Sequence, residues 1–474
     1  MCSTNVHKSI DVELMEGKST SLPKKSEQPS PFRKFLSYPT TNSIKIKPTS
    51  WLDGVRGTAA LAVYIFHAMG IWVPLVSAWH ADEASHHFLQ MPFIRSCFAS
   101  GGAAVAVFFA LSGYVLTHKS LGWIRDGEKQ KVYPAVASSM FRRGFRLYLP
   151  PICITFFEML STRFGFPPPL SFGFQPEPTL AAQILDWLTH TNRFVNPFFT
   201  WRKAIKGIIF HPKYDAVVWT IPLEFYGSLV CYLLLFLLAQ VPSARLRMSF
   251  IAIFSILCMG LGSWNMSCFS AGMLIVDFNL GQDQVSNSLP PNLSSRKMQS
   301  NHGKLWMAIF VAAFYVAGFP TLVYPEAKTQ PMPGFETLRS LTPMSLTMED
   351  HARFLWSISG ILLLLSISQL PSLKRVFETN FCQYIGKIAF SLYLVHEFCL
   401  VLFGISMHTF MVRVAGVGDF RWGLGYWVVC GIWFCLFTIP TFAIAAQVER
   451  WIDAPSVRFA RWLEGKCLRM YKRV

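Results

Sequence analysis

The chain has 474 residues, of which 52% are hydrophobic and only 15% are charged, and its formal net charge is +17. Soluble domains carry roughly 25% charged residues, and a soluble chain of this length divides into domains joined by polar linkers, so an ordinary soluble protein is excluded. The positive charge does not indicate nucleic-acid binding, because the Lys and Arg residues lie between apolar blocks and not on one basic face.

Residues 1–50 are rich in Ser, Thr, Pro and Lys and contain no apolar run, which predicts a disordered cytoplasmic tail and not a signal peptide. Apolar blocks of about 17 to 25 residues follow, the length that a helix needs to cross a bilayer. The fold class is therefore all-α: a polytopic integral membrane protein with about ten transmembrane helices in a membrane domain over 51–448. The predicted crossings are 55–79, 98–117, 146–162, 217–240, 247–263, 264–280, 305–324, 352–370, 384–407 and 424–447.

Basic residues gather in alternate loops between these crossings. The positive-inside rule places those loops and both termini in the cytoplasm, and the acidic loops 80–97 and 325–351 on the opposite side. The chain is thus predicted to be a multi-pass protein of an endomembrane or the plasma membrane. The basic residues in these loops include Lys119, Arg125, Lys129, Lys131, Arg142, Arg143, Arg245, Arg247, Arg296, Lys297, Lys304, Lys374 and Arg375.

Residues 449–474 alternate aromatic and apolar residues with basic ones, as in Trp451, Phe459 and Trp462. This pattern is typical of a helix that lies on an anionic membrane surface, so membrane lipids are expected partners. The alternative is a plain basic cytoplasmic tail that obeys the positive-inside rule.

The first crossing contains ionisable residues, which are costly in a membrane and therefore indicate function. Arg56 and His67 are separated by a near-whole number of helical turns, so they share a face, with His67 about 16 Å deeper. Asp53, three residues before Arg56, is placed to pair with it. A histidine in hydrocarbon favours the neutral form that a general base needs. The alternative is a histidine that only joins helices by a hydrogen bond.

The second crossing contains a run of small residues that starts at Gly101, and Ser112, farther along it, is expected to be a supporting residue. Such runs allow helices to pack closely, and they also leave room for a ligand between helices.

After the second crossing, Arg142, Arg143 and Arg146 cluster at the predicted cytoplasmic mouth of the third crossing. Three guanidinium groups suit a multiply phosphorylated ligand such as coenzyme A, and lipid headgroups are the alternative.

The fourth and ninth crossings carry further candidates. Glu224 follows Trp219 in the non-cytoplasmic half of its helix, where a buried carboxylate needs a histidine or arginine partner from another helix. Tyr393 and His396 are three residues apart and share a helix face. Trp219 and Tyr393 are expected to support the site.

Together these residues resemble a known family. The chain is similar to the acyltransferase 3 family of membrane O-acyltransferases in a series of short motifs. The first four are Asp-Gly-x-Arg-Gly-x-Ala-Ala with a later His (53–67), Gly-Gly…Phe-Phe-x-x-Ser-Gly-Tyr (101–114), Arg-Arg-x-x-Arg-Leu-x-x-Pro (142–150) and Trp-Thr-x-x-x-Glu (219–224). Gly-Lys-Ile-x-Phe-Ser-Leu-Tyr-Leu-x-His (386–396) and Glu449-Arg450 follow in the family's order. The resemblance covers about 50–455 and includes no appended hydrolase-like domain.

The resemblance implies a ten-helix core and a cytoplasmic acyl-CoA donor, with acetyl-CoA expected as the co-substrate. It assigns Arg56, His67, Glu224 and His396 to catalysis. We therefore predict transfer of an acyl group to a hydroxyl of a small molecule, such as a secondary metabolite, or of a glycan, with His67 as general base. The alternatives are a transporter or flippase, which also uses ionisable residues within the membrane, and an inactive scaffold on the same fold.

No metal is expected to take part. The 11 cysteines form no CxxC pair and no zinc spacing, which predicts buried thiols. The cluster His80, Asp82, Glu83, His86 and His87 contains metal-binding residue types, but a solvated loop is the preferred interpretation.

Overall fold

The computed structural model describes residues 46–70, 72–73, 78–79, 88–170, 173–241, 243–288, 296–321, 332–343, 351–418 and 423–471. Within these ranges the regular secondary structure is entirely helical, which confirms the all-α class for the described part of the chain. Most of the predicted tail over 1–50 and the whole cluster of residues 80–87 lie outside these ranges.

Each predicted crossing corresponds to a helix, although the bounds differ. The main helices are α2 (Ser50–Gly70), α4 (Gly101–Arg125), α5 (Val132–Ser161), α8 (Thr220–Leu238), α9 (Ala244–Gly260), α10 (Trp264–Ser288), α11 (Arg296–Ala317), α13 (Ala352–Gln369), α15 (Asn380–Cys399) and α17 (Leu424–Val448). Shorter or peripheral helices are α3 (Ile94–Phe98), α6 (Leu180–Val195), α7 (Pro197–Ile205), α12 (Phe335–Leu341), α14 (Pro371–Phe377), α16 (Ile405–Ala415) and α18 (Ala454–Tyr471). Single π-helical turns, Leu400–Gly404 and Glu449–Asp453, join α15 to α16 and α17 to α18.

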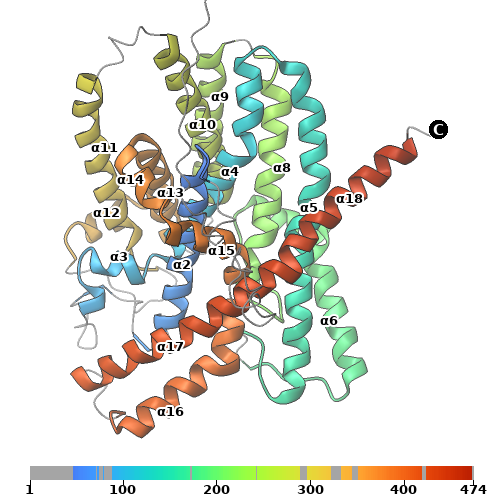
Figure 1. Ribbon diagram of the computed structural model, residues 1–474, viewed down its shortest axis with the longest axis vertical. Helices are drawn as coiled ribbons and strands as arrows, with labels where there is room; N and C mark the ends of the chain where they lie inside the picture. Colours follow the sequence, from blue (N-terminus) through green and yellow to red (C-terminus); the bar gives the residue numbers. More distant parts are fainter. Residues whose placement is uncertain are drawn as a thin grey trace, which may run out of the picture. The chain divides into compact units, whose positions relative to one another are not determined.

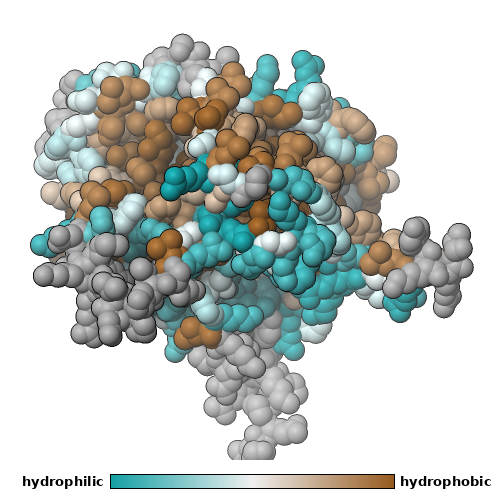
Figure 2. Space-filling model, turned by 90° about the horizontal axis from the view of Figure 1, so that it is seen from above, coloured by the Kyte–Doolittle hydropathy of each residue, from teal (hydrophilic) through white to brown (hydrophobic). Residues whose placement is uncertain are grey.

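Among the residues that the structure describes, five helical segments are long and apolar enough to cross a membrane: Gly101–Arg125, Val217–Leu238, Ala352–Gln369, Asn380–Ala415 and Leu424–Met470. The prediction of about ten crossings is therefore not confirmed by length and composition. Large apolar side chains nevertheless remain exposed on other helices, such as Phe250 and Ile256 of α9. Figure 2 shows hydrophobic residues over a large part of the face seen from above, beside a hydrophilic area near its centre.

Close helix contacts depend on glycine. In Figure 1, α4 lies beside α10, and their backbones touch where Gly113 faces Phe269 and Gly272 faces Ala110. A side chain at either glycine would overlap a backbone carbonyl of the other helix. Among the small residues at the start of α4, Gly102 packs directly on Trp356, so this part of the run serves helix packing.

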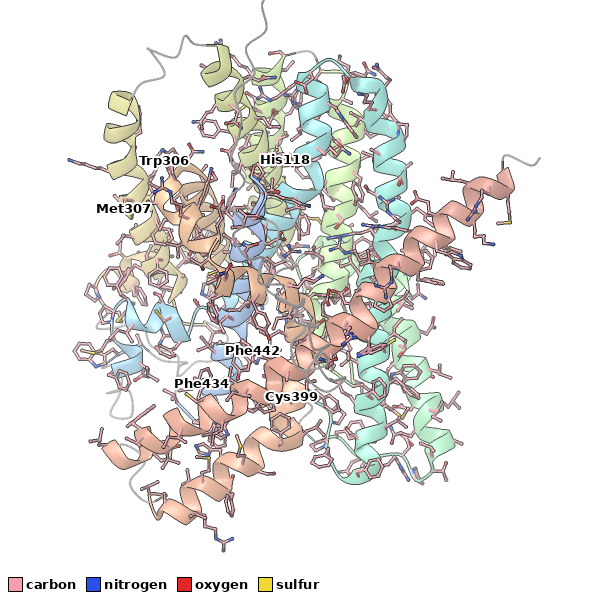
Figure 3. The ribbon with its side chains drawn as sticks, viewed as in Figure 1. His118, Trp306, Met307, Cys399, Phe434 and Phe442 are labelled. Atoms are coloured by element: carbon pink, nitrogen blue, oxygen red, sulfur yellow. The ribbon has the colours of Figure 1, made fainter. Side chains whose placement is uncertain are left out.

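The pair α2 and α15 approaches in the same way. A Cβ atom at Gly57 would overlap Gly386, and one at Gly386 would overlap the backbone of Asp53. This contact aligns the length of α2 against α15 and places the end of α2, with His67, beside the end of α15. Farther along α2, the ring of Tyr64 contacts three aromatic rings of α17, those of Phe434, Phe437 and Phe442. Figure 3 labels Phe434 and Phe442 on this helix.

A buried ion cluster joins α4, α9 and α10. Asp277 of α10 is 0% exposed and accepts hydrogen bonds from Arg125 Nε at 2.6 Å and from Arg247 Nε at 2.7 Å and Nη2 at 2.8 Å. Two guanidinium groups therefore share one carboxylate, and both depend on it for charge compensation.

We expect Asp277→Asn to destabilise the protein by about 3–5 kcal/mol, because it leaves buried guanidinium groups without their counter-charge. Thermal unfolding of the detergent-solubilised protein measures the effect. Glu128→Gln is the matched control, since its ion pair with Lys131 is exposed and contributes about 0–1 kcal/mol. Equal melting temperatures for the two variants would contradict a stabilising role for this cluster.

Candidate active site

His67 lies in the last turn of α2 and faces two residues of α15. Its Nδ1 atom contacts the Glu397 carboxylate, and its ring centroid lies 5.2 Å from that of His396. An ionised carboxylate can only accept, so this contact keeps a proton on Nδ1. The Nε2 atom of neutral His67 then carries the lone pair, which is the arrangement that a general base requires.

His396 is held differently. Its Nδ1 atom lies 2.7 Å from the carbonyl oxygen of Tyr393 and 3.1 Å from that of Leu392, so Nδ1 is the donor. The Nε2 atom is buried and has no hydrogen-bond partner among the described residues. His396 therefore offers a second basic nitrogen beside His67.

The same three side chains form the group with metal-ligand spacing in the described part of the chain. Ligand atoms of His67, His396 and Glu397 lie within 4.8 Å of one another. The sequence predicted no metal here, and the contact between His67 Nδ1 and the Glu397 carboxylate uses one possible ligand atom of each residue.

A first cavity of about 170 Å³ begins beyond this cluster. Arg56 lines it and forms the ion pair with Asp53 that the sequence predicts. Further charged residues in the wall come from four helical segments: Arg143, Arg146, Glu224, Lys387 and Asp453. Four of its six charged lining residues are therefore basic, and apolar side chains form most of the remaining wall.

Glu224 is ion-paired with Arg143 and accepts a hydrogen bond of 2.5 Å from the Ser112 hydroxyl. Arg143 Nε also donates to Ser228 Oγ at 2.8 Å. The sequence placed Arg143 at the cytoplasmic mouth and Glu224 in the opposite half of the membrane. They meet because α5 begins at Val132, so that Arg143 lies about 16 Å inside the helix.

A second cavity, of about 340 Å³, is more basic still. Arg142, Arg143 and Arg146 line it together with Arg461 of α18. Arg142 is paired with Glu464 at 2.7 Å, whereas Arg146 faces both the first and the second cavity. The structure thus brings the three predicted arginines together but gives each a different environment. It also shows that α18, predicted as part of a tail, helps to form this wall.

A third cavity, of about 360 Å³, contains His67. Val105 and Tyr393 line both this cavity and the first one, so the two adjoin at these residues. The Tyr393 hydroxyl donates to the carbonyl oxygen of Val217 and lies 2.8 Å from Thr220 Oγ1. Trp219 also lines the third cavity. The cavities thus adjoin in series from the arginines to His67.

Sequence reasoning missed several residues of this site. Glu397 follows His396 in an apolar helix. Because a carboxylate is costly within a membrane, its presence there could have identified Glu397 as a functional residue. Arg353, at the start of an apolar block, offered the same signal. The sequence could not place Lys387, Asp453 and Arg461 at the cavities, because only the packing of the helices brings them there.

Asp215 also lies near the histidine cluster, in the segment before α8. It is 1% exposed and accepts a hydrogen bond of 2.8 Å from the Val217 amide. Burial raises the pKa of this carboxyl, and the negative charge of Glu397 raises it further.

Comparison with known proteins agrees with this arrangement. The acyltransferase 3 family model, described as an acyltransferase domain, matches residues 49–446. O-acetyltransferase PaAT-1 of Phomopsis amygdali is 30% identical over 445 residues, which cover 89% of this chain and 85% of the relative. Acyltransferase R4 of a Phoma species and acyltransferase clz18 of Cochliobolus lunatus are each 25% identical and cover 86% of this chain and 94% of their own length. No solved structure matches the chain.

The chain therefore belongs to the acyltransferase 3 family, as its motifs predicted. The family and these relatives, each named as an acyltransferase, support acyltransferase activity for this chain, and its described helices include segments long and apolar enough to cross a membrane.

Proposed function

We propose that this acyltransferase moves an acyl group, acetyl in the first instance, from acyl-CoA to a hydroxyl group, with His67 as general base. The observation that carries the proposal is the contact between His67 and Glu397 beside the third cavity, which adjoins the cavities that arginines line. The printed name of PaAT-1 as an O-acetyltransferase supports the choice of acetyl. The acceptor is a small molecule or a glycan that bears a hydroxyl.

In this mechanism His67 Nε2 takes the hydroxyl proton of the acceptor as its oxygen attacks the thioester carbonyl. The Glu397 carboxylate stabilises the imidazolium that forms. When the tetrahedral intermediate collapses, the C–S bond breaks and the leaving thiolate takes the proton back from His67. The products are the ester and free CoA thiol, so no other reactant is needed and no net proton is released.

The donor is proposed to occupy the first two cavities. Its phosphates bind in the basic second cavity, and the thioester arm passes Arg56 toward the boundary at Val105 and Tyr393. Arg143 and Arg142 already have carboxylate partners in Glu224 and Glu464. Arg146 faces both cavities and is therefore the arginine best placed to bind a phosphate.

Labelled acetyl-CoA tests this function. Membranes that contain the protein are incubated with the donor and a panel of hydroxyl acceptors, and ester formation and CoA thiol release are measured together. Equal amounts of both products, absent from membranes with His67→Ala, are the expected result. Movement of an acceptor across vesicles without ester formation would favour the transporter interpretation instead.

We expect Arg146→Gln to raise the donor KM about 10- to 100-fold and to leave the acceptor KM nearly unchanged, because a hydrogen bond to a charged group contributes roughly 1.5–3 kcal/mol. Steady-state kinetics with varied acetyl-CoA measure it. Arg413→Gln on α16 is the control, since this arginine is exposed and lines none of the three cavities. An unchanged donor KM for Arg146→Gln would contradict a role in donor binding and favour the alternative, in which this arginine binds lipid headgroups.

A further inference from the structure

The third cavity differs in character from the two that several arginines line. Its volume of about 360 Å³ is within the usual size range of small-molecule sites. Most of its lining residues are aromatic or aliphatic, among them Val63, Phe66, Ile209, Trp219 and Trp356. The described residues that line it include no Asp, Glu, Asn or Gln. Its wall is therefore mainly apolar.

One face of α2 forms the wall around the base. Val63, Phe66 and His67 all line the cavity, and their spacing of three and four residues puts them on the same side of the helix. The Phe66 and His67 rings meet edge to face, with centroids 5.3 Å apart. His67 lines this cavity and neither of the other two. A hydroxyl that gives its proton to His67 must therefore lie in the third cavity.

Two glycines of α4 support aromatic rings of this wall. A Cβ atom at Gly101 would overlap the Phe66 ring, and one at Gly102 would overlap the Trp356 ring. Both rings therefore rest directly on the backbone of α4. Trp356 Nε1 also donates to the carbonyl oxygen of Phe319 at 2.9 Å. These contacts fix the position of both rings in the wall.

Polar side chains of the wall already have contacts within the protein. The Tyr393 hydroxyl donates to the carbonyl oxygen of Val217, and His211 Nδ1 lies 3.4 Å from another backbone carbonyl oxygen. Arg353 is engaged by the protein as well, since its guanidinium carbon lies 4.8 Å from the ring centroid of Trp219. An acceptor with many hydroxyl groups would exchange its bonds to water for too few new ones, which disfavours a sugar here.

We propose that the third cavity binds the acceptor and that the acceptor is an apolar alcohol. Its reacting hydroxyl lies at His67 Nε2, and its body lies against the rings of Phe66, Trp219 and Trp356. This inference rests on the proposed function, and it selects an apolar small molecule over a glycan. Val63, one helical turn before His67, then limits the size of the body that fits beside the base.

The boundary between the first and third cavities is the place of transfer. Val105 and Tyr393 line both cavities, so a thioester in the first can meet a hydroxyl in the third at these residues. The C–O bond of the ester forms there as the C–S bond breaks, and the hydroxyl proton passes through His67 to the leaving thiolate. The apolar wall therefore selects the acceptor without affecting donor binding.

Cyclohexylmethanol and methyl α-glucopyranoside test the class of acceptor. Each presents a CH₂OH group on a six-membered ring, but the glucoside also carries hydroxyls on the ring itself. With wild-type protein and labelled acetyl-CoA we expect kcat/KM for cyclohexylmethanol to exceed that for the glucoside about 100-fold or more, because each buried hydroxyl without a partner is costly. Equal values, or a higher value for the glucoside, would overturn the proposal.

Val63→Phe tests the location, because the larger side chain takes up space beside the base. We expect it to lower kcat/KM for cyclohexylmethanol about 10-fold more than that for ethanol, which needs little room. The donor KM should stay near that of the wild type, since Val63 lines neither of the first two cavities. Equal losses for the two alcohols would contradict an acceptor site at Val63.

Val115→Phe on α4 is the matched control. Val115 is 53% exposed and lines none of the three cavities, so its replacement should leave kcat/KM for both alcohols near the wild-type values. A loss for cyclohexylmethanol as selective as that of Val63→Phe would show that the effect does not depend on the third cavity, and it would overturn the proposal.

A binding measurement separates this site from the transfer reaction. A benzyl alcohol that carries a photoactivatable diazirine is irradiated with the purified protein in the absence of acetyl-CoA, and labelled residues are identified by mass spectrometry. We expect saturable labelling of residues in the third cavity, weaker in Val63→Phe and unchanged in Val115→Phe. Such labelling without ester formation from acetyl-CoA would contradict the proposed function alone. Labelling that does not saturate, or that is equal in all three proteins, would contradict the acceptor site.

Discussion

His67→Gln should lower kcat by about 10²–10⁴-fold, which is the usual contribution of general acid–base catalysis. Glutamine keeps a hydrogen-bonding side chain of similar reach, so it can replace a histidine that only joins α2 to α15. It cannot accept a proton at neutral pH, so it cannot replace a base. Steady-state kinetics with labelled acetyl-CoA measure the change, and donor binding should remain nearly normal because His67 lines the third cavity and not the first two.

His302→Gln on α11 is the matched control, since His302 is exposed and lines none of the three cavities. Its turnover should stay near that of the wild type. Near-normal turnover in folded His67→Gln would end the catalytic role of His67. His396, whose Nε2 atom is buried beside it, would then be the next candidate for the base.

Glu397→Gln is expected to lower kcat nearly as much as the loss of His67. The carboxylate holds the Nδ1 proton of His67 and faces the imidazolium that forms during attack. An amide can turn its NH₂ group toward Nδ1, which places the histidine proton on Nε2 and blocks the base. The melting temperature should change much less than the activity, because the substitution keeps the size of the side chain.

A double variant distinguishes this coupled role from two independent ones. If His67 and Glu397 act as one unit, His67→Gln/Glu397→Gln should be no slower than His67→Gln alone. If the two rate losses multiply, Glu397 acts separately, and its role as the positioning residue of His67 is wrong. Turnover of Glu397→Gln close to wild type would contradict the pairing as a catalytic feature.

The helices and part of the site could be predicted from the sequence because both depend on local patterns. An apolar block long enough to span a membrane forms a helix wherever it lies, since its backbone groups must be satisfied within the segment. The spacing of Asp53, Arg56 and His67 likewise fixes their common face through the helical period alone. The need of Glu224 for a charged partner followed from the cost of a buried carboxylate.

Helix ends were harder to predict. The polar stretch around Arg142 and Arg146 indicated a loop before the third crossing, yet α5 is one helix from Val132 to Ser161. Contacts with other helices stabilise this stretch, since Arg143 pairs with Glu224 and Arg142 with Glu464. Such distant partners are absent from any local pattern of hydrophobicity.

The sequence by itself determined the all-α class, the family and the principal candidate base, because these depend on residue type and spacing along one helix. Only the tertiary structure decided that Glu397, and not His396, bonds His67, because adjacent residues on α15 point in different directions. It also decided that Arg353 stacks on Trp219 and Trp264, which lie far from it in sequence. Contacts between helices depend on where their backbones approach, and here glycines such as Gly57 and Gly386 set that approach.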